Sequence, residues 1–105
     1  MPKIKDSEKK LVYKIIRRED KTVVNICDKE LIGKIIKGKD NQIEITKEYF
    51  GEDEINNKEA VELMNMSNTL NLVGEEAIKI ANKERIGTSE AVKKIGKVPF
   101  LMVFQ

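Results

Sequence analysis

The spacing of apolar residues divides the chain into a β-prone first part, a helical middle and a β-prone end. Residues 11–17 and 22–27 are rich in β-branched side chains and are separated by a short polar turn, a pattern that predicts a β-hairpin. Residues 34–37 and 42–46 flank a Gly and an Asn suited to a turn, so they predict a second hairpin.

Helical spacing begins in the middle of the chain. Asn56 and Glu59 have the spacing of a capping box, in which each side chain binds the backbone N–H of the other residue. The apolar residues that follow recur at helical intervals and predict a helix over residues 57–70. A second helix is predicted over residues 73–85, because its apolar residues share one stripe.

The chain closes with two further β-prone segments, residues 92–95 and 99–104. This order predicts an α+β fold with a mostly antiparallel sheet, built from the two N-terminal hairpins and the C-terminal strands, with the two consecutive helices packed on it. We expect a single domain over residues 11–105, preceded by a flexible basic arm over residues 1–10. The apolar run 100–104 predicts a central strand buried on both faces, and a homodimer formed through it is the alternative to a monomer.

Composition narrows the class of protein. Charged residues make up 36% of the chain but the net charge is only +2, so we expect a folded chain. Abundant Lys and Glu are typical of heat-adapted proteins, and equally of AT-rich genomes. One cysteine excludes an intrachain disulfide, and no apolar stretch resembles a leader or a membrane span, so a cytoplasmic protein without membrane contact is expected.

The residue types present exclude several common reaction mechanisms. The chain has no histidine, which removes Ser-His-Asp and Cys-His catalysis and the commonest metal ligand. It has no glycine-rich phosphate-binding loop, and its one cysteine, Cys27, ends an apolar segment and is expected to be a small core side chain. We therefore expect no cofactor, no metal and no catalytic residue of a common type.

Two groups of polar residues remain as candidates for a ligand or partner site. Asp28 and Glu30 could bind a divalent cation or act as an acid/base pair, or Asp28 could instead cap a short helix or turn that Gly33 ends. Asn71 and Gly74 lie just before or at the start of the second predicted helix, where free backbone amides could receive an anion. Two glutamates at that helix start favour simple capping instead.

Charge is distributed unevenly along the chain. Residues 1–39 carry 12 basic and 6 acidic side chains, whereas residues 40–90 carry 5 and 12. A basic side formed by both ends of the chain would attract nucleic-acid phosphates, although Tyr13 is the one aromatic residue of the basic half that could stack on a base. The candidate nucleic-acid contacts are Lys9, Lys10, Lys14, Arg17, Arg18, Lys34, Lys37, Lys93 and Lys94.

Three stretches in this order, Cys-Asp-Lys-Glu-Leu-Ile-Gly (27–33), Ile-Thr-Lys-Glu-Tyr-Phe-Gly (45–51) and Asn-Leu-Val-Gly-Glu (71–75), resemble an archaeal family known only as domain of unknown function 424. The resemblance runs from about residue 11 to residue 104. It implies a small cytoplasmic archaeal domain without an established reaction, and it favours Asp28, Glu30, Gly33, Asn71 and Gly74 as the positions to test. Where relatives are expected to carry a histidine, this chain has Phe100.

Our leading hypothesis is a non-enzymatic binding protein that contacts RNA or the translation machinery, including a ribosome-associated protein, through its basic N-terminal side. One alternative is an enzyme or small-ligand site built from Asp28, Glu30 and Asn71, which requires that one pocket join them. A second alternative is a protein-interaction module or a weak homodimer.

Overall fold

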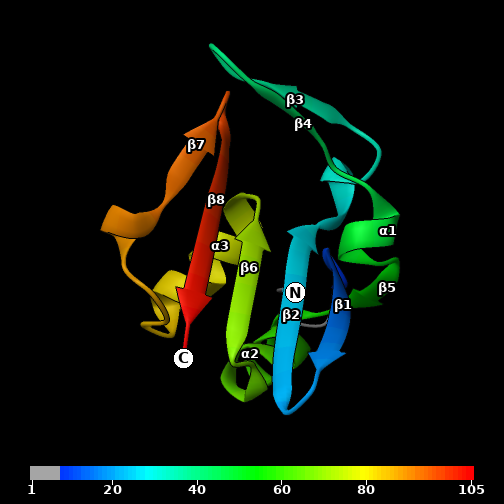
Figure 1. Ribbon diagram of the computed structural model, residues 1–105, viewed down its shortest axis with the longest axis vertical. Helices are drawn as coiled ribbons and strands as arrows, with labels where there is room; N and C mark the ends of the chain where they lie inside the picture. The colour runs from blue at the N-terminus through cyan, green and yellow to red at the C-terminus, as the bar shows by residue number, and fades with distance from the viewer. Residues whose placement is uncertain (1–7) are drawn as a thin grey trace, which may run out of the picture.

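The chain forms a six-stranded sheet, a separate two-stranded hairpin and three α-helices within residues 8–105, which the computed structural model describes (Figure 1). Most of the arm predicted for residues 1–10 therefore lies outside the described residues. The strands and helices are β1 (Leu11–Arg18), β2 (Lys21–Asp28), β3 (Ile35–Lys37), β4 (Gln42–Glu44), α1 (Lys47–Phe50), β5 (Asp53–Ile55), α2 (Asn57–Met66), β6 (Thr69–Val73), α3 (Glu75–Lys83), β7 (Lys93–Ile95) and β8 (Val98–Phe104). Short 3-10 turns cover Lys29–Leu31 and Ser89–Ala91.

The main sheet has the strand order β5-β1-β2-β6-β8-β7. Its first half is the N-terminal hairpin β1-β2 with β5 at the edge, and its second half is β6, β8 and β7. All neighbours are antiparallel except β2 and β6, which run parallel and join the halves. The fold is thus α+β with a mostly antiparallel sheet, as the sequence predicts, with one parallel pair that it does not predict.

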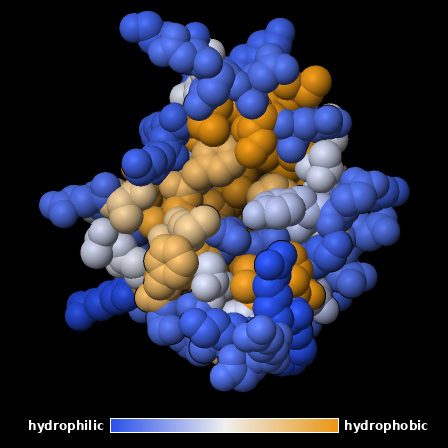
Figure 2. Space-filling model, viewed as in Figure 1, coloured by the Kyte–Doolittle hydropathy of each residue, from blue (hydrophilic) through white to orange (hydrophobic). Residues whose placement is uncertain are grey.

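One face of the sheet is covered only in part. Side chains on this face alternate with those that point to the helices. At its upper end Val12, Cys27 and Val73 pack against Phe50 of α1 and Ile45, which follows β4. The rest of this face carries β8 side chains that are open to solvent, and we call it the open face; it is the side turned to the viewer in Figures 1 and 2.

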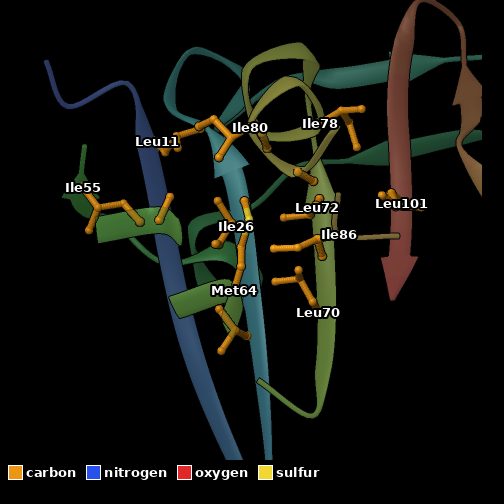
Figure 3. Packing of buried hydrophobic residues seen from close by; sticks show 14 residues of the cluster. Leu11, Ile26, Ile55, Met64, Leu70, Leu72, Ile78, Ile80, Ile86 and Leu101 are labelled. Carbon is orange, nitrogen blue, oxygen red and sulfur yellow. The ribbon is translucent and has the colours of Figure 1, made fainter. Parts of the chain in front are cut away.

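The opposite face is closed by α2 and α3 and holds the larger core (Figure 3). Strand side chains of this core alternate with those of the open face, so Val24 and Ile26 of β2 pack beside Leu70 and Leu72 of β6. The helices contribute alanines together with larger apolar residues, namely Ala60, Met64, Ala77, Ile78, Ile80 and Ala81.

The predicted helix over residues 57–70 is confirmed as far as Met66 but was wrong over residues 67–70, because α2 ends at Met66 and residues 69–73 form β6. Ser67 ends the helix in an extended conformation, and its hydroxyl donates to the Met64 carbonyl at 2.8 Å. Leu70 fits a helical stripe and a strand alternation equally well, which explains the error. The two long helices are consequently separated by a central strand.

Two other expectations about strands also need correction. The hairpin β3-β4 forms as predicted but makes its own two-stranded sheet rather than extending the main one. Strand β8 lies one position from the edge and is not buried on both faces, since Met102 and Phe104 are 54% and 75% exposed. Helix α1 and strand β5 were not predicted.

The capping box at the start of α2 is confirmed. The Glu59 backbone N–H donates to Asn56 Oδ1 at 2.8 Å, and the Asn56 backbone N–H donates to Glu59 Oε1 at 2.9 Å. We expect Asn56→Ala to lower the free energy of unfolding by about 1 kcal/mol, because the Glu59 backbone N–H loses its side-chain acceptor. Urea denaturation measures this, with Asn65→Ala as the control on an exposed face of the same helix. Equal losses in the two variants would contradict a capping role.

Candidate functional site

Asp28 ends β2 with its carboxylate turned toward the start of α3. The backbone N–H groups of Glu76 and Ala77 donate to Asp28 Oδ2 and Oδ1, each at 3.0 Å. The 3-10 turn that follows Asp28 receives no hydrogen bond from this side chain. Asp28 is therefore a cap, but it caps α3 rather than the adjacent turn that the sequence suggested.

Gly74 makes this cap possible. Its φ of +110° is rarely adopted by other residues, and a Cβ there would lie 2.3 Å from the Asp28 side-chain carbon Cγ. The carboxylate therefore occupies the space that any other side chain at position 74 would need. Two predicted site residues, Asp28 and Gly74, are thus in direct contact.

The pKa of Asp28 is raised to about 6. Burial is the main cause, because the side chain is 3% exposed and the charged form loses hydration. The two backbone donors lower the pKa, and the nearby carboxylates of Glu76 and Glu30 raise it. Since both oxygens already accept backbone N–H groups, this carboxylate is held by α3 rather than offered to a ligand.

Glu30 and Gly33 lie close in sequence to Asp28 but have different surroundings. Glu30 is exposed and lines two small surface cavities, of about 280 and 270 Å³, together with Asp28 and Glu76. Gly33 is exposed, has a φ of +91° with open space around it, and donates its backbone N–H to the Ile45 carbonyl at 2.6 Å. In residues 8–105 no three His, Cys, Asp or Glu side chains are grouped so that they could hold a metal ion.

Asn71, the remaining candidate, lies on the open face. Its Nδ2 donates to Asn25 Oδ1 at 2.7 Å, and Asn25 Nδ2 donates to the Tyr49 carbonyl at 3.0 Å. Asn25 and Asn71 are direct neighbours in the parallel pairing of β2 and β6. Sequence reasoning missed Asn25, although a single amide within an otherwise apolar strand is a detectable signal. The structure therefore does not bring Asn71 into one pocket with Asp28 and Glu30.

An apolar cavity of about 470 Å³ lies beside Asn71, and we call it the hollow. Figure 2 shows an apolar depression near the middle of this face, with hydrophilic residues above and below it. Among residues 8–105, Lys93 is the one charged residue in its lining. The other lining residues are Ile43, Tyr49, Phe50, Asn71, Leu72, Val73, Ala91, Phe100, Leu101 and Met102.

The open face is basic in the five strands β1, β2, β6, β8 and β7. Cross-strand pairing and side-chain alternation place Lys14, Arg18, Lys21 and Lys93 on it, all exposed, and place no Asp or Glu on it from these strands. Strand β5 adds Glu54, whose Oε1 lies 3.4 Å from Lys29 Nζ. The charged side chains of this face therefore have one sign over most of the sheet.

The nine predicted nucleic-acid contacts do not share one face. Lys14, Arg18 and Lys93 lie on the open face, whereas Arg17 and Lys94 point to the helix side. Lys9 and Lys10 precede β1, and Lys34 and Lys37 lie at the β3-β4 hairpin. Lys21, which sequence reasoning left out, joins the open-face set through its pairing with Arg18.

Comparison with known proteins places the chain in a family. The family model described as protein of unknown function (DUF424) matches residues 16–105. The chain belongs to the DUF424 family. No curated protein matches this DUF424 chain.

A solved structure shares the fold. It is the crystal structure of an uncharacterised conserved protein from Methanopyrus kandleri, 18% identical over 90% of each chain, with a TM-score of 0.76. In the DUF424 chain Phe100, which stands where the sequence led us to expect a histidine in relatives, lines the hollow. No helix within residues 8–105 is long and apolar enough to cross a membrane.

The contact between Gly74 and Asp28 can be tested with two glycine variants. Gly74→Ala and Gly33→Ala both place alanine at positive φ, which costs about 1–3 kcal/mol each. Only Gly74→Ala also forces a Cβ into the Asp28 carboxylate, so we expect it to lose about 2 kcal/mol more than Gly33→Ala in urea denaturation. Equal losses would mean that the Asp28 side chain moves away at little cost.

The raised pKa of Asp28 predicts a pH dependence of stability. The folded protein holds this proton more tightly than the unfolded chain, whose pKa is near 3.8. The stabilisation is therefore complete below about pH 4 and is lost as the pH rises through about 6, by at most about 3 kcal/mol.

The variant Asp28→Asn cannot ionise and isolates this contribution. Its free energy of unfolding, measured relative to the wild type, is expected to rise between pH 4 and pH 7. A relative fall over the same range would show that the two α3 amides hold the ionised form more strongly than burial disfavours it.

Proposed function

We propose that this DUF424 protein is a non-enzymatic binding protein that takes single-stranded RNA on the open face of its sheet. The observation that carries the proposal is the charge of that face: the strand positions of β1, β2, β6, β8 and β7 present four basic side chains and no acidic one. A polyanion gains affinity from such a surface by releasing its counterions. An RNA of the translation machinery has this chemistry.

The aromatic residues favour an unpaired strand over a duplex. Phe100 and Phe104 project from β8 on the open face, and Tyr49 of α1 lines the hollow beside them. Phe104 and Tyr49 are 75% and 52% exposed. Unpaired bases can stack on such rings, whereas bases in a duplex are already stacked on one another. The fold thus supplies the aromatic surface that the basic N-terminal half lacks by itself.

The same geometry speaks against a reaction at the predicted carboxylates. Both oxygens of Asp28 accept backbone N–H groups of α3, and Asn71 projects from the other face of the sheet. A competing occupant of the open face is a protein, either a second copy of this chain or another partner, since Met102 and Phe104 would be buried by one. The charge of the face favours RNA.

The proposal predicts salt-dependent binding that maps to one face. We expect the affinity for a single-stranded RNA oligomer, measured by fluorescence anisotropy, to fall as salt rises. The double variant Arg18→Glu, Lys93→Glu should weaken binding and reduce the slope of log Kd against log salt by about 1.4, from two lost phosphate contacts on a single strand.

The matched control is Lys58→Glu, Lys83→Glu, which makes the same change of net charge on α2 and α3. Its salt slope should stay close to that of the wild type. If the two double variants lost the same RNA affinity, binding would depend on net charge alone, and this would contradict a binding site on the open face. Absence of binding at low salt would overturn RNA binding, and a dimer mass in light scattering that Phe104→Glu on the open face converts to a monomer mass would assign this face to a second copy.

A further inference from the structure

We propose that the hollow receives one unpaired base of the bound RNA, with Tyr49 against its ring and the Asn71 amide at its edge. This inference rests on the proposed function and adds the group that is recognised. The hollow, at about 470 Å³, falls within the size range of small-molecule sites, and its lining is mostly apolar with few polar groups. That combination suits a flat heteroaromatic ring better than a phosphate or a sugar.

The Asn71 amide is held in a defined orientation. Its Nδ2 donates to Asn25 Oδ1, and Asn25 is itself fully buried and fixed by its bond to the Tyr49 carbonyl. Among the described residues Asn71 Oδ1 accepts no hydrogen bond, so one acceptor remains for a ligand. The second hydrogen on Nδ2 is a donor next to it. An amide with an adjacent donor and acceptor matches the edge of a nucleobase, which presents the same two groups in reverse.

The aromatic side chains and the lysine that line the hollow also suit a nucleotide. Tyr49 and Phe50 reach the hollow from α1, and Phe100 reaches it from β8. A base bound there would contact aromatic side chains of both elements. Lys93 is directly opposite Phe100 in the β7-β8 pairing and lines the hollow, so a phosphate attached to the base finds a cation at the rim.

The chain offers a direct spectroscopic test, because it contains two tyrosines and no tryptophan. Tyr13 points to the helix side, so Tyr13→Phe leaves Tyr49 of the hollow as the only strong fluorophore. In this variant we expect a single-stranded RNA oligomer to quench the tyrosine emission. An oligomer of equal length with abasic sites keeps the phosphates, and it should bind more weakly and leave the emission unchanged.

A second experiment changes the protein instead of the RNA and removes the Tyr49 ring. Tyr49→Ala is expected to weaken binding of the normal oligomer roughly five- to hundredfold, as loss of a base-stacking residue does, and to leave the abasic oligomer unaffected. The Tyr49 side chain is half exposed and only its backbone carbonyl bonds Asn25, so the variant should stay folded. Met66→Ala, an exposed apolar residue of α2, is the matched control.

The outcomes separate the two proposals. Equal affinity for the normal and abasic oligomers, with the salt slope retained, would overturn the base site and leave RNA binding in place. A preference for the normal oligomer without Tyr49 quenching, and without an effect of Tyr49→Ala, would also overturn it, because the bases would then stack elsewhere. Failure of both oligomers to bind at low salt would overturn RNA binding itself.

Discussion

The parallel pairing of β2 with β6 is the constraint on which the rest of the molecule depends. Within the part of the chain that the structure describes, it is the one strand pairing that joins the N-terminal half of the main sheet to the C-terminal half. Its register sets Asn25 beside Asn71 and Cys27 beside Val73. The next residues along the two strands are Asp28 and Gly74, which meet at the start of α3. One register thus positions the amide pair on one face and the helix cap on the other.

The two faces of this sheet differ because the elements that cover them differ in length. Helices α2 and α3 have 10 and 9 residues and close their face with alanines and larger apolar residues. The open face is covered by α1, which has 4 residues, and by the three-residue strands of the β3-β4 hairpin. These short elements reach only the upper part of the sheet, so an apolar hollow and exposed β8 side chains remain. The open face is therefore a consequence of incomplete cover.

Sequence reasoning predicted the local elements better than their assembly. The β1-β2 hairpin, the capping box at Asn56 and the closing strands were read from alternation and spacing, which are local properties. Strand β6 was missed because its apolar residues fit two periods. The pairing of strands 46 residues apart leaves no local trace, so neither the contact between Asp28 and Gly74 nor the amide pair could be placed. The basic residues could be found from composition, and alternation separates Lys14 from Arg17, but only the assembled fold shows which of the two faces the helices cover.

The amide pair also bears on why polar residues persist in the middle of the sheet. Asn25 is fully buried, and an amide there is tolerated only because both of its groups are hydrogen-bonded. A one-residue slip of β6 against β2 would turn Asn71 to the helix side, break this bond and leave a buried amide unsatisfied. The pair therefore penalises the wrong register. An apolar pair would fill the same space but would neither specify the register so strongly nor leave an acceptor on Asn71 facing the hollow.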